Sequence, residues 1–320
     1  MLLEVHMFRS TIAVLSIAAT CVSLAAQQPQ QPIIRSGTDT VRVFVTVTDR
    51  DGRIVSTLTE DKFEVRDEGK AQPITIFDNS PKPIQIVVML DVSGSMDGNL
   101  GLLRAGARQL FSRLGPEDVA RLGTFGKDIV ISPEWTRDAR VLDGALPVEI
   151  DSRAPTPLWR ALDDAMAVFD ATSDRRKVLL VLSDGGDSGP MLGKRFISQG
   201  EIIDRARKDD VMVYGIGFYS RRPTAPPMGM GRGGLSAALG AGEPDPGLAR
   251  TALETGGGYS EVRPRDDLGA AFAAIAEELH SQYLLGFAPP KRDGKKHDID
   301  VKLADRGLTP RARKSYVAPK

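Results

Sequence analysis

The stretch from Ile84 to Ser95, IQIVVMLDVSGS, decides the fold of this 320-residue chain. Its first seven residues form a nearly continuous apolar run, which is typical of a strand that is buried on both faces of a parallel sheet. Asp91 ends the run, and Ser93 and Ser95 follow it closely. Ligands of open α/β sheets bind beyond the carboxyl ends of the strands. The stretch therefore predicts a central strand with a polar site at its end.

Two more buried strands follow along the chain, over Val178 to Leu182 and Val211 to Phe218. Residues 119–125 and 128–132 are shorter strand patterns joined by a Gly-Lys pair, which indicates a hairpin. Apolar residues at helical spacing predict helices over residues 100–114, 157–172, 198–208, 246–255 and 266–280. Strands that alternate with helices in this way predict an α/β fold with a doubly wound, mostly parallel sheet and helices on both faces.

Short strand patterns also flank this unit on both sides. Residues 40–48 alternate with period two, and similar patterns recur at 63–66, 74–77, 283–287, 298–303 and 311–317. We expect the strands of both flanks to pair into one accessory sheet. The expected organisation is a signal peptide over 1–26, a flexible linker over 27–38, an N-terminal β unit over 39–82, the doubly wound domain over 83–282 and C-terminal β segments over 283–320. Residues 221–243 lack periodicity and are expected to form a surface loop.

The first residues have the pattern of an export signal. Arg9 precedes a mostly apolar run from Ser10 to Ala19, and the small residues Ser23 and Ala25 offer a cleavage site. The run is shorter than the about 20 residues of a transmembrane helix. We therefore expect no transmembrane segment and a mature protein that is periplasmic or extracellular.

The composition excludes several classes of site. The 42 Lys and Arg residues balance the 42 Asp and Glu residues, so the chain has no overall attraction for nucleic acid and we expect no nucleic-acid partner. Its one cysteine, Cys21, lies in the expected leader, where the preceding residues fit a lipid-anchor site poorly. One cysteine and three histidines cannot build a Cys-based or His-rich metal site. Oxygen ligands must therefore hold any bound metal.

Oxygen-bearing side chains follow two of the buried strands. Asp91, Ser93 and Ser95 follow the first, and Asp184 ends a later one, where it should lie beside Asp91. Thr156 lies in a loop just before a predicted helix and can point at the same edge. One such site alone would favour helix capping, but three in this order favour a metal. A hard cation such as Mg²⁺ takes six oxygen ligands, some of them waters.

The pattern DxSxS after the first core strand, T-P-L before a helix and D-G after a later strand resembles the von Willebrand factor type A domain. The resemblance covers about residues 83–282. That family's metal-ion-dependent adhesion site uses five oxygen positions, which match Asp91, Ser93, Ser95, Thr156 and Asp184 here. Ala154 stands where the family usually has glycine, which removes no ligand. The flanking motifs FEVxDEGK, YLLGF and RxRKxY are similar to a secreted bacterial group of such proteins that is common in acidobacteria.

The resemblance implies a Mg²⁺ site, with Mn²⁺ or Ca²⁺ as alternatives. It implies that the two serines coordinate directly, that the aspartates act largely through water and that the threonine joins when a ligand is engaged. An acidic side chain of a protein partner would then complete the coordination. The implied function is an exported, non-enzymatic protein-binding module of the adhesion type. The alternative is a structural or assembly scaffold of the envelope, in which the metal only stabilises loops.

Other motifs and polar residues are weaker evidence for a function. Neither serine has the GxSxG frame of a serine hydrolase, and the GxGxxG match at 229–234 follows prolines rather than a strand. We expect His280 and His297 to be structural or solvated rather than catalytic. Asp187 and Ser188, just after the second aspartate of the site, are expected to be solvated loop residues, with support of the metal ligands as the alternative.

Overall fold

The computed structural model of the chain describes residues 40–184, 186–189, 195–219, 244–263 and 265–320. The chain divides into two compact units, Met1–Gly37 and Thr38–Lys320, and the fold described below is that of the second. The expected signal peptide and linker, and the expected loop over 221–243, lie outside the described residues. Among the helices that are described, none is long and apolar enough to span a bilayer.

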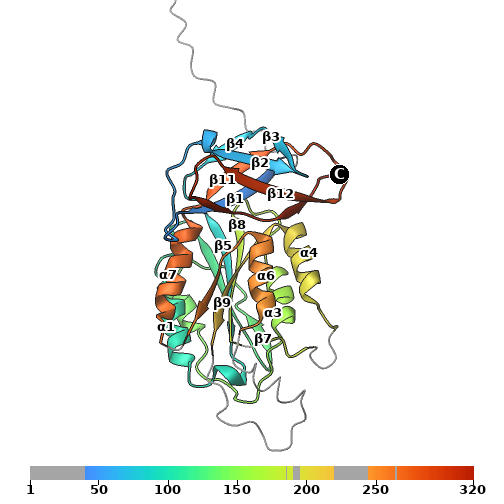
Figure 1. Ribbon diagram of the computed structural model, residues 1–320. Helices are drawn as coiled ribbons and strands as arrows, with labels where there is room; N and C mark the ends of the chain where they lie inside the picture. The colour runs from blue at the N-terminus through green and yellow to red at the C-terminus, as the bar shows by residue number, and fades with distance from the viewer. Residues whose placement is uncertain (1–39, 185, 190–194, 220–243, 264) are drawn as a thin grey trace, which may run out of the picture. The chain divides into compact units, whose positions relative to one another are not determined.

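A six-stranded sheet forms the centre of this unit, with the strand order β10-β9-β8-β5-β6-β7 (Figure 1). Its strands are β5 (Ile84–Asp91), β6 (Val119–Phe125), β7 (Ile129–Ile131), β8 (Arg176–Ser183), β9 (Val211–Phe218) and β10 (Tyr259–Val262). All neighbours pair in parallel except β6 and β7, which form the expected hairpin. The chain leaves β5 on one side to form β6 and returns on its other side as β8. The strand order therefore reverses at β5, the kind of point where doubly wound sheets bind ligands.

Helices cover both faces of the sheet. They are α1 (Leu100–Phe111), α2 (Ala139–Gly144), α3 (Leu158–Met166), α4 (Gln199–Asp209), α6 (Pro246–Thr255) and α7 (Leu268–Leu279). Ile86 and Val88 of β5 belong to one buried cluster together with residues of α1, α2 and α7. Val87 and Met89 belong to a second cluster with residues of α3, α4 and α6. This alternation arises because successive side chains of a strand point to opposite faces, and each face of β5 needs its own apolar cover.

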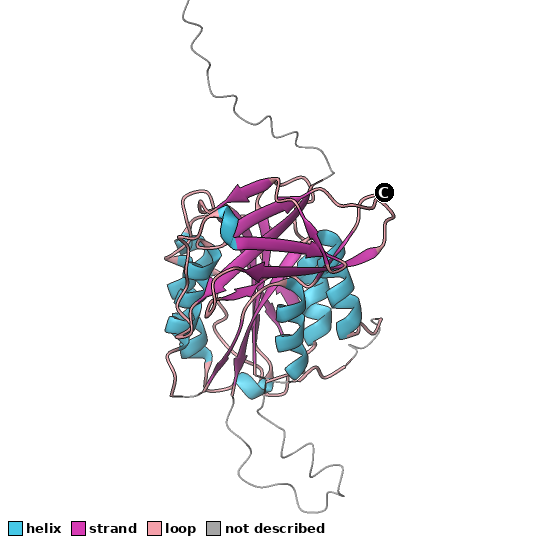
Figure 2. Cartoon of the chain, turned by 45° about the horizontal axis from the view of Figure 1, so that its top comes forward, coloured by secondary structure: helices cyan, strands magenta, loops and turns pink. Residues whose placement is uncertain are grey.

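The two flanks of the chain form an accessory β subdomain of two antiparallel sheets, with the strand orders β13-β1-β11-β4 and β14-β12-β2-β3. The strands are β1 (Val41–Thr48), β2 (Phe63–Asp67), β3 (Lys70–Gln72), β4 (Ile76–Asp78), β11 (Tyr283–Phe287), β12 (Lys296–Leu303), β13 (Thr309–Arg311) and β14 (Ser315–Val317). Figure 2 shows the two sheets above the helices. The predicted fold class, a doubly wound α/β sheet with an accessory β subdomain, is confirmed.

The expectation of a single accessory sheet was wrong. Val43 and Val45 of β1 are fully buried, and they share one cluster with Val65 of β2 and Val301 of β12 from the other sheet. Each of these strands has one apolar face, and two such faces bury their surface by packing against each other. The flanks therefore need two sheets, because a single sheet would leave its apolar face without cover.

Several element boundaries differ from the expected ones. The helix expected over 157–172 ends at Met166. Further along, the Asp170 carboxylate accepts hydrogen bonds from the backbone and hydroxyl of Thr172 in a local turn. The short elements α2 and β10 were not predicted, since neither is long enough to show a periodic pattern.

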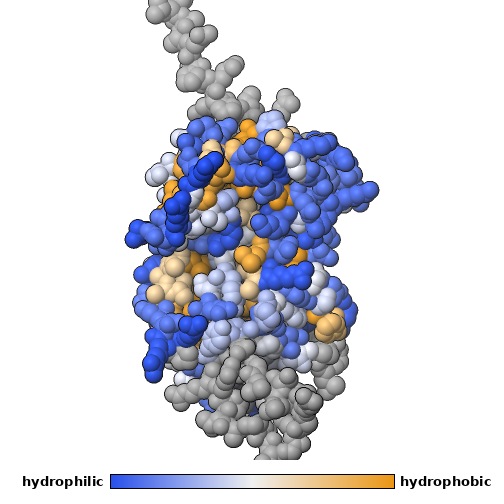
Figure 3. All heavy atoms as spheres, in the orientation of Figure 1, coloured by the Kyte–Doolittle hydropathy of each residue, from blue (hydrophilic) through white to orange (hydrophobic). Residues whose placement is uncertain are grey.

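The accessory subdomain adjoins the edge at which the parallel strands begin (Figure 1). Glu278, in the last turn of α7, accepts a hydrogen bond from the hydroxyl of Thr46 in β1 at 3.0 Å. Arg311 of β13 pairs with the same carboxylate. The outer surface over these strands is largely hydrophilic, with apolar residues in small scattered areas (Figure 3). The opposite edge of the sheet, where the parallel strands end, is therefore free of the accessory strands.

Candidate metal centre

The loop after β5 brings three of the predicted ligands together. Asp91 is fully buried at the end of the strand, and its Oδ1 accepts a hydrogen bond from the backbone N–H of Ser93 at 2.8 Å. The single 3₁₀ turn η2 (Gly94–Met96) follows at once. The turn brings the hydroxyls of Ser93 and Ser95 within 3.0 Å of each other. Ser93 is buried and Ser95 is exposed, so the loop leads from the interior to the surface.

Asp184 completes this arrangement from the neighbouring strand. Leu90 of β5 is paired in register with Leu182 of β8, so both strands end at the same level of the sheet. The hydroxyl of Ser95 donates a hydrogen bond to Asp184 Oδ1 at 2.6 Å. The hydroxyl of Ser183 donates to Asp91 Oδ2 at 2.5 Å. The side-chain oxygens of four predicted ligands thus lie in one continuous cluster.

Thr156 lies on the loop that adjoins this cluster. The backbone N–H of Gly94 donates to the carbonyl of Ala154 at 3.1 Å. The approach is close, because a Cβ on Gly94 would lie 2.1 Å from the carbonyl oxygen of Ser152. Thr156 itself is 8 % exposed. Among the contacts of the described residues, no hydrogen bond joins its hydroxyl to the other four side chains, so its approach to a metal remains a prediction.

Asp187 and Ser188 do more than the solvated loop residues that we expected: Ser188 is exposed and Asp187 is half-buried, and they hydrogen-bond to the loop that carries Thr156 and to the start of α3. The hydroxyl of Ser188 accepts from the Thr156 N–H at 3.0 Å, and the Ser188 N–H donates back to the Thr156 carbonyl at 2.9 Å. Asp187 accepts from the N–H of Trp159 at 3.3 Å, in the first turn of α3. Short side chains of this type often hydrogen-bond to backbone amides, and the sequence Asp187-Ser188-Gly189 carried that signal. These residues brace the threonine loop.

Asp187 also forms a hydrogen bond with the N-terminal end of α6. The Asp245 side chain, which caps that helix, accepts from the Asp187 N–H at 3.1 Å and from the Gly247 N–H at 2.6 Å. Nothing in the sequence pairs Asp245 with the site, because it is separated from Asp187 by 58 positions. The loop after β8 is consequently held between the first turns of two helices.

The electrostatics of the cluster suit a cation. Burial raises the pKa of Asp91 to about 7, and the negative charge of Asp184 acts in the same direction, whereas hydrogen bonds from Ser183 and Ser93 oppose the rise. Two buried carboxylates at one edge are costly without a compensating charge. The donors here are carboxylate and hydroxyl oxygens, which are the ligands that hard divalent cations prefer. The residues therefore fit Mg²⁺ in their chemistry.

A second group of metal-ligand types lies in the accessory subdomain. Asp67, Glu68 and His297 each offer an atom within 4.8 Å of the others. Other side chains of the protein already contact the Asp67 carboxylate. Its Oδ2 accepts a hydrogen bond from the Tyr316 hydroxyl at 2.8 Å, and its Oδ1 lies 3.0 Å from Nδ1 of His297. We interpret this group as a tie between β2, β12 and β14. His297 is 4 % exposed, which accords with the structural role expected for it.

Comparison with known proteins places the central sheet in a family. Residues 86–186 match the sequence pattern of the von Willebrand factor type A domain. The matched segment runs from β5 to just beyond β8 and contains all five predicted ligands. This segment of the doubly wound part is therefore of the von Willebrand factor type A kind. Among curated protein sequences, no match was found.

A search of solved structures also found several chains with partial similarity to this one. The protein BatB from Bacteroides thetaiotaomicron is 18% identical with a TM-score of 0.46, over 61% of this chain and 97% of BatB. A von Willebrand factor type A protein from Catenulispora acidiphila is 12% identical with a TM-score of 0.43, over 88% of this chain and 74% of that one. Proximal thread matrix protein 1 from the mussel byssus, with a zinc-occupied MIDAS motif, is 15% identical with a TM-score of 0.44. The match covers 68% of this chain and 50% of that protein's chain.

Proposed function

We propose that this protein is an exported, non-enzymatic module that binds a protein partner through a divalent metal ion, with Mg²⁺ as the metal and Mn²⁺ or Ca²⁺ as alternatives. The observation that carries the proposal is the continuous cluster of Asp91, Ser93, Ser95 and Asp184 at the switch point of the sheet. It consists of oxygen donors from two adjacent strand ends, the type of ligand set that holds Mg²⁺ in proteins.

The burial of these residues indicates how a partner would approach. Asp91 and Asp184 are fully buried, whereas Ser95 is exposed at the outer end of the cluster. A cation held here would offset the charge of the two carboxylates and would keep part of its coordination shell on the side of Ser95. An acidic side chain from a protein partner can reach that side. The accessory strands adjoin the other edge of the sheet and do not cover this side.

Direct metal binding is the first test of the proposal. We expect Mg²⁺ to bind the full chain with one-to-one stoichiometry in calorimetry and to raise its melting temperature, because a ligand that binds only the folded state stabilises that state. Asp184→Asn should weaken the affinity about tenfold or more, since it removes a charged ligand. Asp97→Asn is the matched control: Asp97 is an exposed carboxylate two residues beyond Ser95. Equal losses in both variants would contradict the site.

Partner capture is the second test. Ser95→Ala removes one exposed oxygen together with its hydrogen bond to Asp184, so we expect a small fall in the melting temperature of the metal-free protein, which should stay folded. In an extract of the native cells, capture of the partner should require Mg²⁺ and should be lost with EDTA or in the Ser95→Ala protein. Capture that persists in EDTA would refute metal-dependent binding. If the metal then only raised the melting temperature, the scaffold alternative would replace the proposal.

A further inference from the structure

A second cavity lies at the edge of the sheet where the parallel strands begin, opposite the metal centre. Its volume is about 540 Å³, which is within the range of small-molecule sites. Its walls come from β1, from the chain that leads out of α3, from the start of β8 and from the end of α4. Phe44, Met166 and Phe169 give it an apolar part.

Basic side chains dominate the rest of the wall. The basic residues that line it are Arg42, Arg175, Arg176, Lys177, Arg205 and Lys208, against the acidic residues Asp174, Asp209 and Asp210. Two of the three acids are already engaged, because Asp209 pairs with Arg205 and Asp210 pairs with Arg313. Arg42 and Lys208 are exposed, and among the described residues neither side chain has a carboxylate partner. The cavity therefore carries an excess of positive charge.

Arg176 adds a buried charge to this wall. The residue is 6 % exposed, and its guanidinium hydrogen-bonds to the neutral Gln282 side chain and the carbonyl of Leu279 rather than to a carboxylate. It lies over the ring of Phe44, with Cζ 4.8 Å from the ring centroid, and its Nε has no hydrogen-bond partner in the described part of the chain. Burial lowers the pKa of this guanidinium from its usual value. The charges of Glu278 and Asp118 oppose this lowering, but the guanidinium's hydrogen bonds go to neutral groups, and a bound anion nearby would reduce the cost of its burial.

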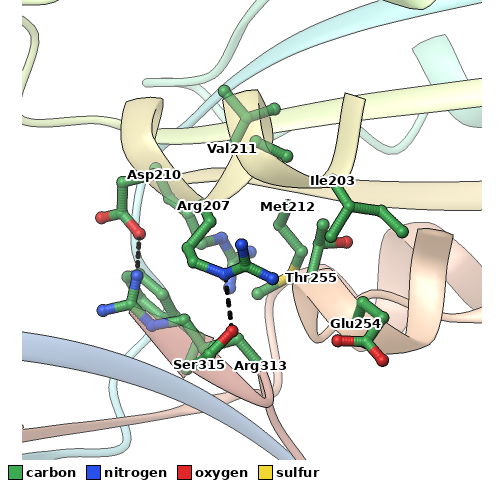
Figure 4. Close-up of a pocket in the computed structure, with 12 residues that line it drawn as sticks. Ile203, Arg207, Asp210, Val211, Met212, Glu254, Thr255, Arg313 and Ser315 are labelled. Atoms are coloured by element: carbon green, nitrogen blue, oxygen red, sulfur yellow. Dashed lines mark hydrogen bonds and ion pairs between the residues drawn. The ribbon is translucent and has the colours of Figure 1, made fainter. Parts of the chain in front are cut away.

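The adjoining smaller cavity shows how its other arginines are used. It shares Phe44, Arg176 and Asp210 with the basic cavity. In Figure 4, Arg207 contacts Ser315 and Arg313 contacts Asp210, so both guanidinium groups are held by the protein itself. The available positive charge thus lies on the side of the larger cavity, around Arg42, Arg176 and Lys208.

We propose that this basic cavity binds a small polyanion of the pyrophosphate type, with two neighbouring phosphate groups. Planar guanidinium groups match phosphate oxygens in pairs, and lysine adds a compact charge. An excess of three positive charges in the wall suits a ligand with several negative charges more than a single carboxylate. The apolar residues leave room for an uncharged portion of a larger ligand. This site is independent of the proposed metal-dependent function, because it lies at the opposite edge and uses none of its residues.

The test is calorimetric titration of the full chain with inorganic pyrophosphate in EDTA, so that no metal can bridge the ligand to the protein. We expect saturable one-to-one binding. Arg42→Ala combined with Lys208→Ala should weaken it about tenfold or more, since charged hydrogen bonds to phosphate are lost. Both side chains are exposed, so the melting temperature of the ligand-free protein should not change. The matched control is Lys127→Ala combined with Arg153→Ala, which removes one exposed lysine and one exposed arginine outside the cavity.

Three outcomes would overturn the proposal. The first is the absence of saturable heat with pyrophosphate. The second is an equal loss of affinity in both double variants, which would indicate general attraction to positive charge rather than a site. The third is tighter binding of citrate than of pyrophosphate, since that would assign the cavity to polycarboxylates.

Discussion

His280, at the C-terminal end of α7, lies 2.8 Å from Asp118 through Nε2 and Oδ2. Asp118 also accepts hydrogen bonds from the backbone N–H groups of Ile84, at the start of β5, and of Gly115. This carboxylate therefore joins the last turn of one helix to the first residue of the central strand. The histidine expected to be structural or solvated is structural.

The pair predicts a pH dependence of stability. The hydrogen bond that His280 donates to the Asp118 carboxylate raises the pKa of His280 above its usual 6.5, against the opposing effect of burial. Burial favours a higher pKa for Asp118, but its hydrogen bonds prevail and lower it. A raised histidine pKa means that the folded state holds the proton more tightly, so this stabilisation is fully present below pH 6.5 and is lost as pH rises through the raised value.

We therefore expect the stability advantage of the native protein over His280→Gln to decrease between about pH 6 and pH 8. Urea unfolding of both proteins across that interval measures it. His297 is common to the two proteins, so its own titration cancels in the difference. A constant difference across the interval would show that the pair makes no proton-linked contribution.

Gly94 offers a test of the contact between the loop after β5 and the loop that carries Thr156. A Cβ at this position would lie 2.1 Å from the Ser152 carbonyl oxygen, so Gly94→Ala must displace the loop that carries Thr156. We expect a loss of about 1–3 kcal/mol in the free energy of unfolding, the usual cost of an overpacked contact, and weaker Mg²⁺ binding.

The control for that change is Gly101→Ala, within α1, where no atom lies within 4 Å of the added Cβ. This substitution should not lower stability and should raise it by less than about 1 kcal/mol, because alanine is favoured over glycine in a helix and Gly101 lies in the first turn. Urea unfolding and calorimetry of both variants provide the measurement. Normal metal binding by Gly94→Ala would separate the Thr156 loop from the site.

Ser188 should act as a positioning residue for Thr156. Ser188→Ala removes the acceptor of the Thr156 N–H and should cost about 1 kcal/mol or less, since the serine is exposed. Mg²⁺ affinity should fall a few-fold while stoichiometry is kept. Ser112→Ala, which loses only a hydrogen bond to the Gln109 carbonyl at the end of α1, should leave the affinity unchanged. A merely structural serine would lower the melting temperature in calorimetry without changing the metal affinity.

The central strands could be predicted because their burial is written in continuous apolar runs. β5 occupies Ile84–Asp91 and all its residues are buried, so an apolar residue was required at nearly every position. β8 extends the predicted run by two residues at its start and one at its end. Because both runs end next to an aspartate, the proximity of Asp91 and Asp184 followed from the parallel sheet alone.

The remaining features depend on contacts between distant segments. Alternation in β1 shows which face is apolar but not which strand covers it, and its partner β11 comes more than two hundred residues later. Ser188 and Asp187 show the general tendency of such side chains to bond to amides, whereas their partners in the Thr156 loop are set by the tertiary fold. Pattern alone therefore predicted the candidate ligands but not the residues that hydrogen-bond to their loops.

One strand, β8, runs from the basic cavity to the candidate metal centre. β8 begins at Arg176, in the wall of the basic cavity, and ends at Ser183, next to the predicted metal ligand Asp184. Seven steps along a strand cover about 23 Å at about 3.3 Å per residue. Because β8 is a buried strand, it holds the basic cavity and the candidate metal centre at a fixed separation. A protein partner bound at the candidate metal centre and an anion bound in the basic cavity would occupy opposite edges of the sheet. The protein can therefore bind both at the same time, on two surfaces that face away from each other.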